Sequence, residues 1–316
     1  MEVLITGVAG FIGSNLADYL LAKGVKVVGV DNFDNFYDRS VKEHNLSKAL
    51  TNSNFHFFEI DITDAAKLNS IKFSGDTVIH LAAKVGVRPS IENSKIYVHN
   101  NIIGTQVVLD WMQLKGIKKL VFASSSSVYG NNEKTPFSET DNVDHPISPY
   151  AFTKKACELL NFTYFKLYGI SSVNLRFFTV YGERQRPDLA IHKFVNLISH
   201  GHPIQMYGTG ETGRDYTYVR DIVNGIEAAM LHVNKPTPVY EIINLGNSSP
   251  VKLSELVNTI SQLLNKEAIT NFLPPQPGDV EFTFADITKA SQLLNYHPST
   301  SLKAGLQNFI TWFKEQ

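Results

Sequence analysis

Short apolar runs and longer helical patterns alternate along the first half of the chain. The apolar runs cover residues 3–5, 26–31, 55–60, 77–81, 120–123 and 173–178, and helical patterns lie between them, notably at 13–23, 96–114 and 150–167. Strands that are apolar throughout and alternate with helices are typical of a parallel sheet covered on both faces. The pattern therefore predicts an α/β fold with a doubly wound parallel sheet of the Rossmann type.

The pattern changes after about residue 180. Most of the 13 prolines lie in residues 181–316, where short helical patterns alternate with short strands and long loops. We expect a smaller α/β domain there, closing over the carboxyl ends of the sheet formed by residues 1–180. The helical pattern at residues 219–230 fits either half, so some segments beyond residue 180 are candidates for return to the first domain.

Composition narrows the functional class. The 316 residues carry a formal net charge of −1, without the basic surplus of a nucleic-acid-binding protein. No apolar run approaches the roughly 20 residues that cross a membrane. The single cysteine, Cys157, excludes an internal disulfide, and the histidines show no metal-ligand spacing. We expect a cytoplasmic protein with no metal, no nucleic-acid partner and no membrane partner.

A glycine-rich turn joins the first predicted strand to the first predicted helix. It contains Gly7, Gly10, Phe11, Ile12 and Gly13. Glycines there permit a tight turn and let backbone N–H groups approach a pyrophosphate, which the positive end of the helix also attracts.

An acidic residue closes the second predicted strand. From this position the Asp31 carboxylate can bind the hydroxyls of an adenosine ribose. Asn32 and Phe33 follow it, with no arginine to hold a ribose phosphate, so the pattern favours NAD over NADP. We expect the acidic and aromatic segment 31–38 to form the loop over the adenosine end.

A serine, a tyrosine and a lysine form the candidate catalytic set. Tyr150 and Lys154 are four positions apart on a predicted helix, and Ser125 follows the predicted strand at residues 120–123. A nearby ammonium and the charge of an oxidised nicotinamide lower the pKa of a tyrosine from its usual value of about 10. Tyr150 is then a general base for a sugar hydroxyl, and Ser125 shares the same proton.

Together these residues resemble the extended short-chain dehydrogenase/reductases over nearly the whole chain. The resemblance rests on residues 6–13, 31, 61–62, 80–83, 124–130, 150–154 and 214–216. Within that family the sequence is similar to the nucleotide-sugar 4-epimerases, most of all to the UDP-glucuronate 4-epimerases. The resemblance implies an NAD-binding domain at residues 1–180 and a mainly UDP-sugar-binding domain at residues 181–316.

The resemblance also implies roles for individual residues. Ser125, Tyr150 and Lys154 would be catalytic, and a homodimer would form through the helices at residues 96–114 and 150–167. Besides the glycine-rich turn, the residues implied beside NAD are Asp31, Asn32, Asp61, Ile62, Leu81, Ala82, Ala83, Lys84, Asn100, Tyr150, Lys154 and Phe177.

The residues after Ser125 separate the subfamilies. The related 4,6-dehydratases carry Asp-Glu there and the decarboxylases place Glu in this stretch, whereas this chain has Ser126 and Ser127. Serine hydroxyls cannot act as acid or base catalysts near neutral pH, so elimination and decarboxylation are disfavoured. The remaining reaction is oxidation of the sugar followed by return of the hydride. Thr179 stands where UDP-glucose 4-epimerases usually carry Asn. The hydroxyls of Ser126, Ser127 and Thr179 could bind a sugar carboxylate. Alternatively, the two serines only fill a polar turn.

Other polar residues are candidates for the UDP group. Arg88 and Arg214 suit the diphosphate, because guanidinium groups match phosphate oxygens. Arg186 either assists the substrate or is a solvated loop charge, and Tyr207 either stacks on uracil or packs in the core. Asp279 is a candidate for the uridine ribose.

We therefore expect an NAD-dependent isomerase that interconverts UDP-glucuronate and UDP-galacturonate through a 4-keto intermediate. The sequence leaves open a UDP-glucose 4-epimerase, another nucleotide-sugar epimerase or dehydratase, and a non-catalytic NAD-binding protein on the same fold.

Overall fold

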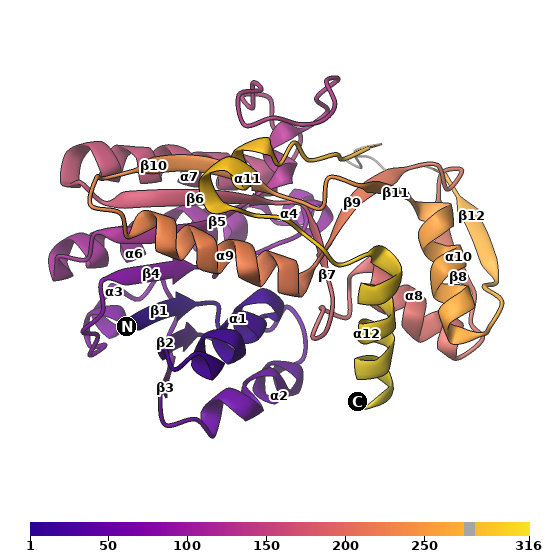
Figure 1. Ribbon diagram of the computed structural model, residues 1–316, viewed down its shortest axis with the longest axis horizontal. Coiled ribbons are helices and arrows are strands. Elements are labelled where there is room, and N and C mark those ends of the chain that lie inside the picture. Colours follow the sequence, from indigo (N-terminus) through magenta and orange to yellow (C-terminus); the bar gives the residue numbers. More distant parts are fainter. Residues whose placement is uncertain (275–281) are drawn as a thin grey trace.

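The computed structural model describes residues 1–274 and 282–316 and contains a central seven-stranded parallel sheet (Figure 1). The sheet order is β10-β6-β5-β4-β1-β2-β3. The strands are β1 (Glu2–Thr6), β2 (Lys26–Asp31), β3 (Phe55–Glu59), β4 (Thr77–His80), β5 (Lys119–Ser125), β6 (Ser171–Phe177) and β10 (Tyr240–Leu245). Every pairing in this sheet is parallel, so the predicted doubly wound fold is confirmed.

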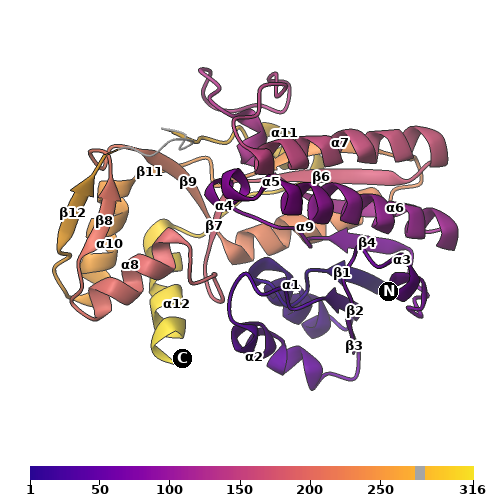
Figure 2. The same ribbon diagram turned by 180° about the vertical axis from the view of Figure 1, so that it is seen from behind.

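Helices cover both faces of the sheet (Figures 1 and 2). One face carries α1 (Phe11–Ala22), α2 (Arg39–Leu50) and α9 (Val219–Val233), and the other carries α3 (Ala65–Asn69), α6 (Gly104–Lys115) and α7 (Pro149–Tyr168). Side chains along a strand point alternately to the two faces. Accordingly Val3 and Ile5 belong to one apolar core and Leu4 belongs to the other.

Helix α7 begins and ends where its sequence signals stand. The Ser148 hydroxyl accepts a hydrogen bond from the Ala151 N–H, Pro149 occupies the first turn, and Gly169 closes the helix in the left-handed region at φ 65°. The helix predicted at residues 150–167 is therefore confirmed, with Tyr150 in its first turn.

The helix predicted at residues 96–114 is interrupted. It consists of α5 (Ser94–Tyr97), a π-helical segment (Val98–Ile103) and then α6. The wider π turn carries Asn101, whose amide donates to the Lys84 carbonyl and to the Thr153 hydroxyl and accepts from the Lys84 N–H. A π segment is often found at functional sites, and this one ties the loop after β4 to helix α7.

Residues beyond 180 contribute to both parts of the molecule. Helix α9 and strand β10 lie with the main sheet, next to α11 (Thr288–Leu294). The remaining strands form two small sheets, β11-β9-β7 and β12-β8, and three helices pack with them. These strands are β7 (Thr179–Tyr181), β8 (Ile204–Tyr207), β9 (Gly213–Tyr218), β11 (Pro250–Lys252) and β12 (Thr270–Leu273), and the helices are α8 (Ala190–Ser199), α10 (Leu253–Leu264) and α12 (Leu302–Lys314).

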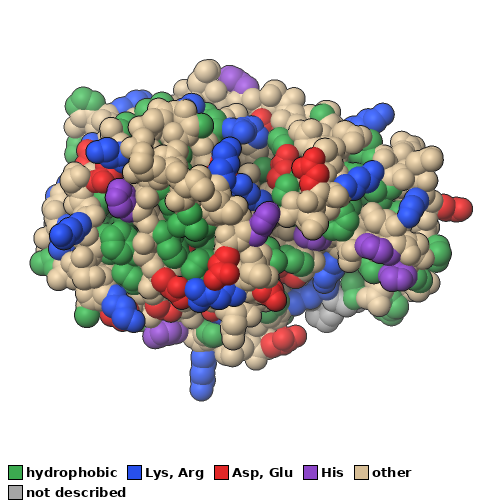
Figure 3. Space-filling model, turned by 90° about the horizontal axis from the view of Figure 1, so that it is seen from below, with side chains coloured by type: hydrophobic (Ala, Val, Ile, Leu, Met, Phe, Trp, Pro, Cys, Tyr) green, Lys and Arg blue, Asp and Glu red, His purple; other side chains and the backbone are tan. Residues whose placement is uncertain are grey.

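The surface carries charges of both signs. Acidic and basic side chains are interspersed on the face seen in Figure 3. In the part of the chain that the structure describes, no helix combines the length and apolar character needed to span a bilayer.

A buried ion pair lies behind strand β5. Arg176 on β6 donates two hydrogen bonds to the Glu158 carboxylate on α7, at 2.9 and 2.8 Å, and both side chains are only 1% exposed. The Ser124 hydroxyl on β5 donates to the same carboxylate at 2.6 Å. The pair therefore joins strands β5 and β6 to helix α7 directly beside Ser125.

Removing one partner of this pair should destabilise the fold strongly. We expect Arg176→Met to lower the free energy of unfolding by about 3–5 kcal/mol, because Glu158 is left buried without its cation. The double variant Arg176→Met/Glu158→Leu should recover much of this loss, since no uncompensated charge remains. Urea unfolding of the three proteins measures both effects. A loss below about 1 kcal/mol in the single variant would contradict the assigned role.

Candidate active site

One cavity of about 1450 Å³ runs from the glycine-rich turn to the small sheets of the second half. It opens at the carboxyl ends of the parallel strands, where ligands bind in open α/β sheets. Most of the predicted site residues line it: Gly7, Gly10, Phe11, Ile12, Gly13, Asp31, Asn32, Ile62, Leu81, Ala82, Ala83, Lys84, Arg88, Asn100, Ser125, Tyr150, Lys154, Phe177, Thr179, Arg186, Tyr207 and Arg214.

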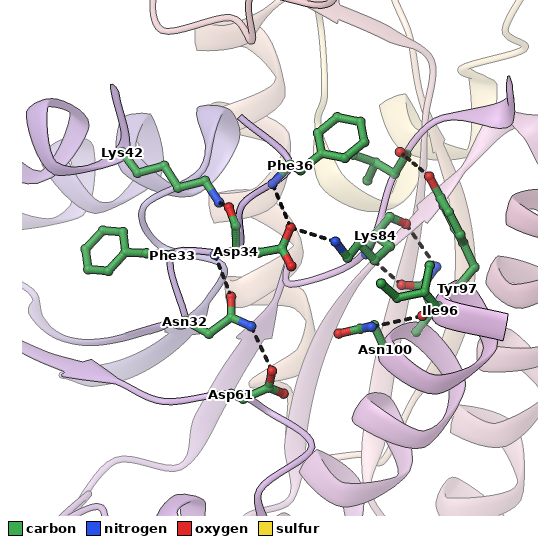
Figure 4. Close-up of polar contacts among 12 residues, drawn as sticks. Asn32, Phe33, Asp34, Phe36, Lys42, Asp61, Lys84, Ile96, Tyr97 and Asn100 are labelled. Atoms are coloured by element: carbon green, nitrogen blue, oxygen red, sulfur yellow. Dashed lines mark hydrogen bonds and ion pairs between the residues drawn. The ribbon is translucent and has the colours of Figure 1, made fainter. Parts of the chain in front are cut away.

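A few predicted residues lie outside this lining. Asp61 accepts a 2.8 Å hydrogen bond from the Asn32 amide and so positions a lining residue (Figure 4). Ser126 and Ser127 form the short 3₁₀ turn (Ser126–Tyr129) after β5. The Ser127 hydroxyl accepts a hydrogen bond from the Ser125 hydroxyl at 3.1 Å, so it is coupled to the cavity through Ser125. Asp279 lies outside the described residues.

The glycine-rich turn fits a pyrophosphate because its backbone is not covered by side chains at Gly7 and Gly13, where a Cβ would collide with neighbouring backbone atoms. Gly7 has φ +72°, and a Cβ on it would lie 2.7 Å from the Ala82 nitrogen. A Cβ on Gly13 would lie 2.2 Å from the Gly7 carbonyl oxygen. Gly10 caps α1 with no side-chain hydrogen bond, so backbone N–H groups of the helix N-terminus face the cavity. These features match the pyrophosphate cradle of a dinucleotide-binding fold.

Asp31 holds the turn and closes the adenosine end of the cavity. Its carboxylate accepts hydrogen bonds from the Ala9 N–H at 3.0 Å and from the Phe33 N–H at 2.9 Å. Burial raises the pKa of Asp31, and the Phe33 hydrogen bond and the charge of Lys42 oppose that rise. A carboxylate at this place can accept hydrogen bonds from the ribose hydroxyls of NAD.

The segment after Asp31 crosses the cavity. Asp34 forms a 2.7 Å ion pair with Lys84, and the Phe36 ring lies 5.0 Å from the Arg186 guanidinium (Figure 4 shows Asp34, Phe36 and Lys84). Asp34 and Phe36 belong to the segment 31–38 that was expected to form a loop over the site, and both line the cavity, whereas sequence reasoning missed Lys42. It also missed helix α2, because this helix is largely polar. The usable signal was the N-cap Asp38, which accepts a hydrogen bond from the Ser40 N–H.

The candidate catalytic residues meet at the end of β5. Ser125 is the last residue of this strand, and Tyr150 stands in the first turn of α7. The Tyr150 N–H donates to the Ser90 hydroxyl, and the Tyr97 ring packs edge-on against the Tyr150 ring at 6.3 Å. These contacts fix the backbone and the ring of the candidate base.

Burial and nearby charges act in opposite directions on the candidate catalytic residues. Burial raises the pKa of Tyr150, whereas the Ser125 hydrogen bond and the positive charge of Arg186 lower it. Lys154 donates to the Ala123 carbonyl at 2.7 Å, and burial lowers the pKa of its ammonium to about 8. Among the charged groups around Tyr150, Arg186 favours the tyrosinate and lowers the pKa of the phenol.

The far end of the cavity collects the residues expected at the UDP group. The Arg88 guanidinium lies 5.0 Å from the ring of Tyr207, which stands at the cavity wall rather than in a core. Arg214 donates to the Gly213 carbonyl at 3.0 Å. Arg186 is 13% exposed and forms two hydrogen bonds with Asp188, so it is not a solvated loop charge. Within the described ranges, no group of three or more His, Cys, Asp or Glu side chains is arranged to bind a metal ion.

Comparison with known proteins agrees with this geometry. The sequence model of the family described as GDP-mannose 4,6 dehydratase matches residues 4–309. A UDP-glucuronate 4-epimerase of Thermodesulfobacterium geofontis is 44% identical over 99% of this chain and 96% of its own length.

Solved structures are similar over their full length. A UDP-glucuronic acid 4-epimerase of Bacillus cereus, in complex with UDP-glucuronic acid and NAD, superposes with a TM-score of 0.93 at 37% identity, covering 100% of this chain and 99% of the other. A UDP-glucose 4-epimerase of Thermotoga maritima, with UDP-glucose, gives 0.90 at 32% identity over the same shares. The chain therefore belongs to the nucleotide-sugar epimerase and dehydratase family of extended short-chain dehydrogenase/reductases, among the UDP-glucuronate 4-epimerases.

Proposed function

We propose that this chain is an NAD-dependent isomerase that interconverts UDP-glucuronate and UDP-galacturonate. The observation that carries the proposal is that the pyrophosphate cradle, Ser125 and Tyr150 open into a single cavity of about 1450 Å³. This volume exceeds the few hundred to about 1000 Å³ of a pocket for one small ligand, so a cofactor and a nucleotide sugar can lie side by side.

The cradle and the segment after it account for the cofactor. The turn from Gly7 to Gly13 would hold the pyrophosphate and Asp31 the adenosine ribose, while Lys154 and Tyr150 would lie beside the nicotinamide ribose. Bound NAD+ would supply a hydride acceptor for carbon 4 of the sugar, and its reduced form would supply the hydride that returns to the opposite face.

The reaction needs a proton to move with the hydride. Tyr150, as tyrosinate, takes the proton from the sugar 4-hydroxyl, and the Ser125 hydroxyl shares that hydrogen bond. The sugar is thereby oxidised to the 4-keto form. After the keto sugar turns about its diphosphate link, Tyr150 gives the proton back to the oxygen at carbon 4. Configuration is inverted and no NAD is consumed.

The choice of a uronate rests on hydroxyl groups around Ser125. Thr179 lines the cavity at the start of β7, and Ser127 is hydrogen-bonded to Ser125. Hydroxyls of Thr179, Ser126 and Ser127 would donate to the sugar carboxylate, and hydroxyl rotors can re-form these bonds after the ring has turned. The relatives described as UDP-glucuronate 4-epimerases support this substrate.

We also propose that two copies associate through the helical region 96–114, which contains the π segment and most of α6, and through α7. Helices α6 and α7 lie side by side on one face of the sheet (Figure 2). Ile103, at the end of the π segment that precedes α6, is 41% exposed, and Phe152 and Leu159 on α7 are 48% and 57% exposed. A second copy would cover them.

We place the protein in the cytoplasm, and the buried, unpaired thiol of Cys157 supports a reducing compartment.

The proposed mechanism predicts that replacing Tyr150 lowers turnover strongly. Tyr150→Phe should lower kcat for UDP-glucuronate at least about 100-fold, because a general base contributes about 10²–10⁴-fold. Binding of UDP-glucuronate, measured by calorimetry, should change little. Tyr168→Phe, at the exposed end of the same helix, is the matched control and should retain normal turnover. Near-normal turnover by Tyr150→Phe would refute the mechanism.

The pH dependence of turnover should report the charge of Arg186. Its positive charge favours tyrosinate and so lowers the pKa of Tyr150. Removing it in Arg186→Met raises that pKa, so the ascending limb of kcat against pH should move to higher pH. Lys166→Met, on the exposed face of α7, should leave the profile in place. An unchanged or acid-shifted profile in Arg186→Met would show that this charge does not act on the base.

A further inference from the structure

The loop after strand β7 forms two successive turns, at residues 182–185 and 186–189. In each turn the N–H of the last residue donates to the carbonyl of the first, at 3.1 and 3.2 Å. Arg186 and Asp188 in the second turn form a 2.7 Å ion pair and line the cavity. Arg184 in the first turn lies outside the cavity lining. The two turns therefore join a wall of the cavity to another part of the molecule.

Helix α1 holds the first of these turns. The Asn15 amide donates to the Glu183 carbonyl at 3.0 Å, and the Arg184 guanidinium donates to the Asp18 carboxylate at 2.7 Å. Asn15 and Asp18 are three positions apart, so they share one face of the helix. Because α1 begins at the glycine-rich turn, the loop is fixed against the element that carries the pyrophosphate cradle.

The ion pair of Arg184 and Asp18 has two features that lower stability. Arg184 has φ 66°, in the left-handed region that favours glycine. The two side chains are 17% and 14% exposed, and Asp18 Oδ1 and Arg184 Nη1 have no hydrogen-bond partner among the described residues. A glycine at this turn and an apolar residue on α1 would avoid both features. The pair is therefore better explained by the position that it gives to the loop.

The position of this loop affects the surroundings of Tyr150. Tyr97 on α5 packs against the Tyr150 ring, and Lys154 lies one turn further along α7. Arg186 reaches the same cavity from the loop, and its positive charge favours the tyrosinate of residue 150. Of these three neighbours, Arg186 is the one that stands on the two turns. A shift of the loop therefore changes the distance of its charge from the phenol.

We propose that Arg184 is a positioning residue, which holds Arg186 in the cavity beside Tyr150 through its ion pair with Asp18. It acts through the loop and not on the reacting atoms, and the proposal rests on the role of Tyr150 in the proposed function. One hydrogen bond, from Nη2 of Arg184, makes the contact with Asp18. A lysine ammonium at position 184 can supply such a donor.

Direct charge effects and loss of positioning differ in sign at Asp18. Removing this carboxylate alone takes a negative charge out of the protein, which would lower the pKa of Tyr150. Releasing the loop lets Arg186 move away, which would raise that pKa. The double variant Asp18→Ala/Arg184→Met removes one charge of each sign and leaves no unpaired buried ion. Its effect on Tyr150 therefore reports the position of the loop.

The first test measures kcat for UDP-glucuronate against pH in this double variant. We expect the ascending limb to move to higher pH by about half a pH unit or more, because the charge of Arg186 moves away. Arg184→Lys should keep the wild-type profile. Arg220→Met removes an exposed charge that lies 5.0 Å from the ring of Tyr19 on α1, and it should also leave the profile in place. A double-variant profile that coincides with that of the wild type would overturn the proposal.

The second test asks whether the effect passes through Arg186. In an Arg186→Met background the same two substitutions should produce no further shift, because the charge whose position they change is absent. A shift as large as that in the wild-type background would overturn the assignment. A purely structural role of the pair would lower stability in both backgrounds, measured by urea unfolding, and would leave the limb in place.

A titration without turnover keeps this test apart from failure of the proposed function. Tyrosinate absorbance is followed against pH in the wild type and in the double variant, and the same titration of the matching Tyr150→Phe proteins is subtracted. We expect the difference signal, which belongs to Tyr150, to appear at higher pH in the double variant. Equal titrations would overturn the role of Arg184. A wild type that does not epimerise UDP-glucuronate would refute the proposed function, and this titration would still decide the role of Arg184.

Discussion

The close approach of Gly7 to Ala82 is the contact on which the rest of the site depends. A Cβ on Gly7 would lie 2.7 Å from the Ala82 nitrogen, so the loops after β1 and β4 can meet only because this position has no side chain. Their contact brings the N-terminus of α1 beside the segment from Leu81 to Lys84. One ligand can therefore touch both loops. The backbone also adopts φ +72° there, which other residues rarely do.

Two polar networks extend this arrangement toward the reacting group. Asn101 binds both the N–H and the carbonyl of Lys84 and also the Thr153 hydroxyl, so the loop after β4 is tied to helix α7. Behind β5, Glu158 binds Ser124 and Arg176 at once. Ser125 and Tyr150 thus stand on elements that are tied to the cradle by buried hydrogen bonds. Such rigidity is what a general base needs to meet a sugar hydroxyl in a fixed geometry.

The sequence predicted those elements that carry a signal in their own residues, such as an apolar run, a helix cap or a glycine pattern. The apolar strands, the capped helix α7 and the glycine-rich turn each carry their own pattern, and the predicted fold and family follow from them. Strand β10 and helix α2 were not predicted, because β10 is defined by pairing with β6 and α2 is largely polar. The place of Lys42 in the cavity lining depends on the packing of α2 against the glycine-rich turn, which a spacing argument cannot supply. The π segment at Asn101 likewise follows from tertiary hydrogen bonds.

The central claim is that the protein oxidises and then reduces carbon 4 of a uronate within one cavity, without releasing the hydride to solvent. The most direct test incubates the protein with UDP-glucuronate deuterated at carbon 4 and an equal amount of unlabelled UDP-glucose in ordinary water, followed by NMR. The account predicts that UDP-galacturonate forms first and keeps its deuterium at carbon 4. Loss of the deuterium to solvent would contradict hydride return, and earlier formation of UDP-galactose would contradict the uronate site.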